Sequence, residues 1–122
     1  MPSALHYMLS RTNRFNGLNA LNFVHKQGKV QRGGSFSIKY VLNQRRDTYR
    51  VAVVVSKKVS KSAVTRNRIR RRVFEIARHE LADLREPYDI AFMIYDATIA
   101  TMPSAKLQQM VKAQLQRTNM IK

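Results

Sequence analysis

Two short apolar runs, at residues 51–55 and 88–95, lie on either side of a long segment with helical periodicity. Every residue of the first run is apolar, which is typical of a central strand covered on both faces. A strand, a helix and a second strand in this order form a β-α-β unit, in which the two strands run parallel. The pattern therefore predicts a sheet with both strands in its interior and a helix packed against it.

The helix between these strands is predicted at residues 63–84, with Ser60 or Ser62 as its N-cap. Pro87 ends it, because proline cannot continue a helix. At about 100° per residue, its apolar side is formed by Ile69, Val73, Ile76, Ala77 and Leu84. Glu80 falls on the same side, and we attribute this exception to fraying near the C-terminal end.

The remaining elements complete the order α-β-β-α-β-α. We expect a helix at residues 18–27, a strand at 36–40 and a final helix that begins at Pro103. Residues 29–34 are predicted to form a basic loop, and a polar turn at 44–47 is consistent with a hairpin between the neighbouring strands.

The predicted fold class is therefore α+β, with a three- to four-stranded sheet covered by helices. A chain of 122 residues is long enough for one domain with a modest core, so we assign residues 1–122 to a single domain. Residues 1–13 are a candidate disordered tail.

Positive charge is concentrated in the first three-fifths of the chain. Residues 1–72 hold 17 Lys and Arg against one acid, whereas residues 73–122 hold six basic and six acidic residues. A solvated helix face would place acids three or four positions from its arginines, but none occurs from Lys57 to Arg72, and Glu75 is the first. Because such a patch repels itself unless a polyanion neutralises it, the sequence predicts nucleic-acid binding.

The residues predicted to contact nucleic acid share this segment. Arginine presents a fixed fork of donors that suits phosphates and base edges, and an asparagine amide can read a base or sugar edge. The predicted contacts are Lys57, Lys58, Lys61, Arg66, Asn67, Arg68, Arg70, Arg71 and Arg72. Aromatic side chains on a basic surface can also stack on unpaired bases, although alternating aromatics such as Phe36 and Tyr40 more often pack a core.

Catalytic groups are nearly absent from the sequence. There is no cysteine, and His6, His25 and His79 are too scattered to suggest a metal site or a nucleophile–base pair. No apolar stretch approaches the roughly 18 residues that a membrane span needs, so we expect no membrane partner and a cytoplasmic location. We predict no catalytic residue and no metal ligand.

Two motifs in the basic segment resemble the signature of the bacterial ribonuclease P protein component. Val55-Ser56-Lys57-Lys58-Val59 matches the family's "VSKK" strand end, and Arg66-Asn67-Arg68-Ile69-Arg70-Arg71 matches its "RNR" helix. The weaker pattern Arg14-Phe15, Leu21, Val24 and Gly28 fits the family's first helix, so the resemblance spans nearly the whole chain.

The resemblance implies a protein subunit that binds a large catalytic RNA and helps it to cleave the 5′ leader from precursor tRNA. The RNA, with Mg²⁺ that it holds mainly itself, performs the hydrolysis, so no cofactor is expected to bind tightly to the protein alone. The implied partners are the catalytic RNA and precursor tRNA, with no stable protein partner. The family fold also has a left-handed β-α-β crossover, contrary to the usual right-handed rule.

The family's functional surfaces carry over to positions of this chain. The arginine helix and the connector before it would contact the RNA, and a cleft between the first helix and the sheet would hold the leader. The candidates for that cleft are Phe15, Leu21, His25, Phe36, Lys39 and Tyr40. Leu21 and His25 stand where the family often has phenylalanine. The family also more often has a basic residue at the position of Phe74, whereas in this chain the basic residue is Arg72, two positions earlier.

Three other functions stay open from the sequence. A general RNA-binding or ribosome-associated protein would carry the same basic patch. A metal-dependent nuclease could use Asp89 and Asp96, which flank the strand at residues 88–95, although carboxylates at strand ends more often cap turns. Sequence-specific DNA binding is disfavoured, because no short helix-turn-helix pair precedes the arginine helix.

Overall fold

The computed structural model describes residues 18–121, and their elements follow the predicted order with two additions. The additions are a short strand after the first helix and a 3₁₀ helix before the last one. The elements are α1 (Leu18–Gln27), β1 (Lys29–Gln31), β2 (Phe36–Leu42), β3 (Arg50–Val55), α2 (Ala63–Glu80), β4 (Tyr88–Ile94), η3 (Ala97–Ala100) and α3 (Ser104–Arg117). Among these, no helix is long and apolar enough to cross a membrane.

The four strands form one mixed sheet in the order β1-β2-β4-β3. β3 and β4 are parallel, as the β-α-β pattern predicts, and β4 is antiparallel to β2. The predicted hairpin between β2 and β3 is wrong, because β4 lies between these two strands. β3 is consequently an edge strand rather than a central one, and its crossover handedness stays a prediction of the family resemblance.

Residues 51–55 of β3 are all apolar because both faces of the strand are covered, although it pairs with only one of the described strands. Val51, Val53 and Val55 belong to the main core beneath α2, while Ala52 packs on the opposite face with Val24 of α1. Near-continuous apolarity therefore reports how the two faces are buried, and it does not show where a strand stands in the sheet.

The segment after α1 is a strand rather than the predicted loop. α1 stops at Gly28, whose N–H donates to the carbonyl of Val24 at 2.8 Å, and β1 then pairs antiparallel with β2. A Cβ at Gly28 would lie 2.4 Å from that carbonyl oxygen, so only glycine fits this reversal. The turn between β1 and β2 is held from α3, because Gln114 Nε2 donates to the carbonyls of Gln31 and Phe36, each at 2.9 Å.

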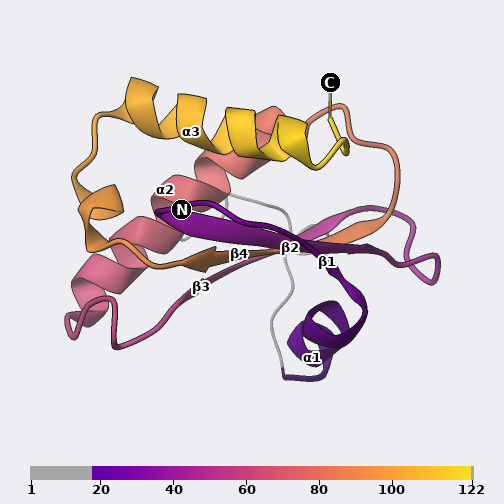
Figure 1. The fold of residues 1–122 in the computed structure, drawn as a ribbon, viewed down its shortest axis with the longest axis horizontal. Helices are drawn as coiled ribbons and strands as arrows, with labels where there is room; N and C mark the ends of the chain where they lie inside the picture. Colours follow the sequence, from indigo (N-terminus) through magenta and orange to yellow (C-terminus); the bar gives the residue numbers. More distant parts are fainter. Residues whose placement is uncertain (1–17, 122) are drawn as a thin grey trace, which may run out of the picture.

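The helices cover the two faces of the sheet unequally (Figure 1). α2, η3 and α3 lie over one face and enclose the main core, which contains Phe36, Ile38, Val73 and Phe92. α1 lies over the other face, where a small cluster joins Val24 to alanines of β3 and β4. Because strand residues alternate between faces, even-numbered residues of β2 point to the main core and odd-numbered ones to the side of α1.

α2 begins and ends in ways that the sequence anticipated only in part. Ser62 is its N-cap, with Oγ accepting from the N–H of Thr65 at 3.2 Å. The helix ends at Glu80 rather than residue 84, and a turn at 81–83 leads toward β4. Fraying does not explain Glu80, whose carboxylate accepts from Gln108 Nε2 of α3 at 3.2 Å. Its position on the inner side of the helix is used to join α2 to α3.

Candidate nucleic-acid interface

The connector between β3 and α2 presents three lysines at the entrance of the helix. Residues 56–62 fold into a tight turn, in which the N–H of Val59 donates to the carbonyl of Ser56 at 3.1 Å. Lys57, Lys58 and Lys61 are all exposed on it. The first turn of α2 carries no acid, so its outward N–H groups add to the positive potential of the ammonium groups. This end of the molecule is suited to binding phosphates.

Arg68 and Arg71 extend that surface along α2. Both are exposed, and no side-chain hydrogen bond or ion pair joins either one to another residue of the described part. Being three positions apart, they are neighbours on one side of the helix. All five donors of each guanidinium are therefore available to a ligand.

Arg66 and Arg70 are partly used by the protein itself. Arg66 Nη1 donates to the carbonyl of Ser60 at 2.8 Å, which ties the connector to the helix. Arg70 Nη1 donates to Asn67 Oδ1 at 2.6 Å, so the amide group of Asn67 is held in place and its NH₂ stays exposed. Each guanidinium keeps further donors, and each is fixed in direction before any ligand arrives.

Arg72 is engaged inside the fold. Its Nη1 donates to the carbonyl of Ile99 at 2.6 Å, and its Nη2 donates to the carbonyl of Met102 and lies 3.4 Å from Ser104 Oγ. These contacts anchor η3 and the start of α3 to α2. Arg72 lies one helical turn beyond Arg68, where the side chain meets this segment instead of solvent. We therefore remove Arg72 from the predicted nucleic-acid contacts.

Two of the aromatic candidates for the leader cleft lie on the wrong face of the sheet. Phe36 is 2% exposed, and its ring packs in the main core with its centroid 6.0 Å from that of Phe92. Tyr40 shares this face and is half-buried, with its ring centroid 6.2 Å from that of Tyr88. Strand alternation sends both rings away from α1, so the prediction that they line a cleft beside α1 is wrong.

The other described candidates meet between α1 and β2. Lys39 Nζ lies 2.9 Å from His25 Nδ1, and Leu21 packs with the small cluster under α1. A lysine can only donate, so Nδ1 accepts and the ring hydrogen of the neutral histidine is on Nε2. Partial burial and the nearby Lys39 charge both lower the pKa of His25, which favours this neutral form. Phe15, the remaining candidate, lies outside the described residues.

The two aspartates of the nuclease alternative are committed to structure at opposite ends of β4. Asp89 is fully buried and accepts from Arg50 Nε and Nη2, both at 2.8 Å, and from Asn43 Nδ2 at 2.9 Å. Asp96 caps η3 by accepting from the N–H of Thr98 at 2.9 Å, and this bond is the main cause of its lowered pKa. Within residues 18–121 no three His, Asp or Glu side chains gather into a metal-binding group. The nuclease alternative therefore loses its support.

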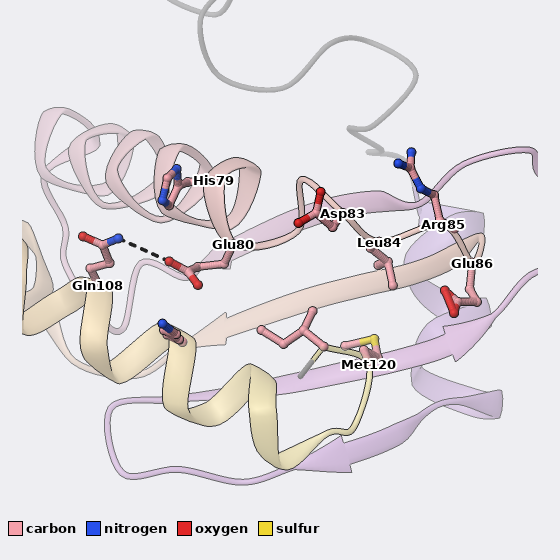
Figure 2. Close-up of a pocket in the computed structure, with 10 residues that line it drawn as sticks. His79, Glu80, Asp83, Leu84, Arg85, Glu86, Gln108 and Met120 are labelled. Carbon is pink, nitrogen blue, oxygen red and sulfur yellow. Dashed lines mark hydrogen bonds between the residues drawn. The ribbon is translucent and has the colours of Figure 1, made fainter.

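A pocket of about 650 Å³ lies at the far end of α2 from the arginines (Figure 2). It is lined by the end of α2, the following turn and α3, and three of its residues are the acids Glu80, Asp83 and Glu86. From Arg66 to Glu80 the helix rises about 21 Å, at roughly 1.5 Å per residue. Arg85 and Lys112 also line the pocket, so acids and bases are mixed there, unlike in the acid-free segment from Lys57 to Arg72.

Sequence reasoning passed over one exposed aromatic residue. Tyr95 follows β4 directly and is 52% exposed. The sequence predicted Tyr95 as the last residue of a buried strand. In the structure β4 ends one residue earlier, at Ile94, and the tyrosine is exposed.

The fold and this surface define a small basic α+β protein with an arginine-rich helix over one face of its sheet. The sequence profile of the family described as Ribonuclease P matches residues 9–119. The chain is 35% identical over 97 residues to the ribonuclease P protein component of Pseudanabaena sp. (strain PCC 6903), covering 80% of this chain and 82% of that protein. It is 39% identical over 85 residues to that of Clostridioides difficile (strain 630), covering 66% and 73% respectively.

Solved structures agree with this match. The RNase P protein of Staphylococcus aureus superposes with a TM-score of 0.77 at 21% identity, covering 89% of this chain and 97% of that one. The RNase P protein of Thermotoga maritima gives a TM-score of 0.74 at 21% identity, with 86% and 96% covered. The chain belongs to the ribonuclease P protein family. It is thus a protein component of a tRNA-processing ribonucleoprotein, and its partner is an RNA.

Proposed function

We propose that this protein binds the catalytic RNA of ribonuclease P through the connector and the outward side of α2. The observation that supports this most is the set of exposed cations on the connector and α2 that have no side-chain hydrogen bond or ion pair within the described part of the chain. That set is Lys57, Lys58, Lys61, Arg68 and Arg71. Arg66 and Asn67 flank it in fixed orientations, so little side-chain entropy is lost when phosphates bind.

The 5′ leader of precursor tRNA is the second ligand that we propose, on the side of the sheet that carries α1. Lys39 offers an ammonium group to a leader phosphate, and His25 Nε2–H offers a neutral donor beside it. An unpaired leader suits this surface, because splayed nucleotides expose both their phosphates and their base edges. The leader would thus be held by α1 and β2 while the body of the tRNA stays on the RNA subunit.

In this proposal the protein promotes 5′ maturation by electrostatics. Mg²⁺ held by the RNA supplies the hydrolytic chemistry. The cationic surface neutralises phosphates that repel one another near the cleavage site, so the assembled site needs less free Mg²⁺. Lys57 and Arg68 act here through charge and position and take no part in proton transfer.

The second candidate function is general RNA binding, for example as a ribosome-associated protein. The same exposed cations favour it, since phosphate contacts carry no sequence information by themselves. Competition binding separates the two candidates. Labelled cognate ribonuclease P RNA is bound to the protein at physiological salt and challenged with unlabelled copies of itself or with an unrelated structured RNA. We expect the cognate RNA to compete at least tenfold better, and equal competition would favour the general function.

A further inference from the structure

Tyr95 stands where the two proposed RNA surfaces approach each other. β3 and β4 are parallel and Val55 pairs with Ile94, so the next residues, Ser56 and Tyr95, emerge side by side. Adjacent strands lie about 4.8 Å apart, so the tyrosine begins directly beside the connector that carries Lys57 and Lys58. Figure 1 shows β4 ending on the side of the molecule where this connector turns into α2.

Strand alternation also gives the side of the sheet on which Tyr95 lies. Ala91 belongs to the small cluster under α1, and Met93 packs against that cluster. Tyr95 continues the same odd-numbered series, so it falls on the α1 side of the sheet. It therefore lies on the side to which we assign the leader, at the end nearest the arginine helix.

The backbone on both sides of Tyr95 is fixed although its side chain is exposed. The N–H of Tyr95 donates to the carbonyl of Ser35 at 2.9 Å, which extends the β2–β4 ladder by one bond. The next residue, Asp96, accepts from Ser35 Oγ at 3.2 Å and from the N–H of Thr98 at 2.9 Å. A half-exposed aromatic ring on a fixed backbone loses little conformational entropy when a planar group stacks on it.

We infer that Tyr95 is a stacking platform for an unpaired RNA base between the leader surface and the arginine helix. This inference rests on the proposed function, because it needs single-stranded RNA on the α1 side. The ring supplies a face that any base can use, and the flanking lysines hold the adjoining phosphates. The base can come from the precursor leader or from the catalytic RNA. The two sources are distinguished by which complex, with precursor tRNA or with the catalytic RNA, loses affinity when the ring is removed.

The test uses holoenzyme assembled from the cognate catalytic RNA and full-length protein. Tyr95→Ala removes the ring, Tyr95→Leu keeps apolar bulk without a π face, and Tyr95→Phe keeps the ring. Affinity is measured for precursor tRNA with a long leader, for mature tRNA without one, and for the catalytic RNA alone. Leu42→Ala is the matched control, since Leu42 is 41% exposed at the opposite end of the sheet.

We expect Ala and Leu at position 95 to weaken one of these complexes by about tenfold, while Phe retains wild-type affinity. Loss confined to the leader-bearing tRNA assigns the base to the leader, and loss with the catalytic RNA alone assigns it to that RNA. Unchanged affinity of both Ala and Leu variants in every complex would overturn the inference. Stimulation of precursor tRNA cleavage by the wild-type protein is measured separately. The proposed function can therefore stand while this inference fails.

A fluorescence measurement tests the same inference in case the Ala or Leu variant fails to fold. The chain contains no tryptophan, so Tyr95→Trp introduces a single emitter at the site. Saturation of this holoenzyme with precursor tRNA should quench the emission strongly, because a stacked base contacts the indole face. Emission that stays constant at saturation would contradict stacking at this position.

Discussion

At the scale of single residues, neighbouring arginines of one helix differ in what they hold. Arg68 and Arg71 extend into solvent, Arg66 holds the connector, and Arg72 holds η3 and α3. Sequence alone presents them as one cluster, because composition and spacing cannot show which carbonyl oxygens lie within reach. The cluster was therefore predictable from the sequence, and its division into exposed members and members that hold the fold together was not.

Arg68→Gln and Arg72→Gln should consequently affect different properties of the protein: RNA affinity in the first variant and stability in the second. Removing the Arg68 guanidinium should weaken RNA binding and reduce the slope of log affinity against log salt by about one, with unchanged stability. Removing that of Arg72 should lower the free energy of unfolding by about 1.5–3 kcal/mol, since its carbonyl partners lose a charged donor. Urea unfolding and RNA titration at several salt concentrations measure both effects. Equal loss of stability in the two variants would show that the division is mistaken.

Asp89→Asn should destabilise the protein strongly, because it leaves Arg50 largely buried without its carboxylate. Breaking a buried pair on one side typically costs about 3–5 kcal/mol. Asp83→Asn, at an exposed acid of the α2–β4 turn, is the matched control and should change stability by less than about 0.5 kcal/mol. Thermal unfolding of the two variants measures this difference. A stable Asp89→Asn protein would revive a functional role for that aspartate.

His25 should titrate below its usual value of about 6.5 in the free protein, because burial and Lys39 both disfavour its charged form. A base with a lowered folded-state pKa stabilises the fold above the unfolded value and loses that contribution as pH falls. NMR titration of the imidazole resonances gives the pKa directly. Lys39→Met should move it upward while leaving burial in place, and an unchanged value would show that the pair is absent in solution.

At the scale of elements, periodicity predicted most helices and strands but not their pairing. The helix at Leu18–Gln27 and the parallel pair of β3 and β4 follow directly from apolar spacing. The predicted β2–β3 hairpin failed because a short polar turn looks the same whether the next strand pairs locally or leaves room for a later one. β1 was missed because three residues at an edge carry too little apolar pattern to distinguish a strand from a loop.

Val53→Asp should unfold the protein although β3 is an edge strand. Val53 is 7% exposed and faces α2, so an aspartate there would bury an unpaired charge or force the helix away. Val64→Asp is the control on α2 itself, where the side chain is 79% exposed. Circular dichroism and hydrogen exchange should show loss of the native state in the first variant and native protection in the second. Retained protection in Val53→Asp would contradict the packing of β3 under α2.

At the scale of the whole molecule, charge is polarised along α2. The N-terminal end and the connector are basic and free of acids, whereas the pocket at the other end mixes three acids with Arg85 and Lys112. We expect the exposed cations at the basic end to steer RNA toward the connector and the start of α2. The sequence predicted a charge asymmetry from counts alone, but the concentration of exposed cations at the start of α2 required the bounds of that helix.

The most direct test of the account is cleavage of precursor tRNA by the cognate ribonuclease P RNA at low Mg²⁺, with and without this protein. We expect the protein to raise the cleavage rate strongly at low Mg²⁺, to have less effect at high Mg²⁺, and to cleave nothing without the RNA. The Arg68→Gln variant should stimulate less than wild type at the same protein concentration. Tight binding of the wild-type protein to the RNA with no stimulation at any Mg²⁺ concentration would contradict the account.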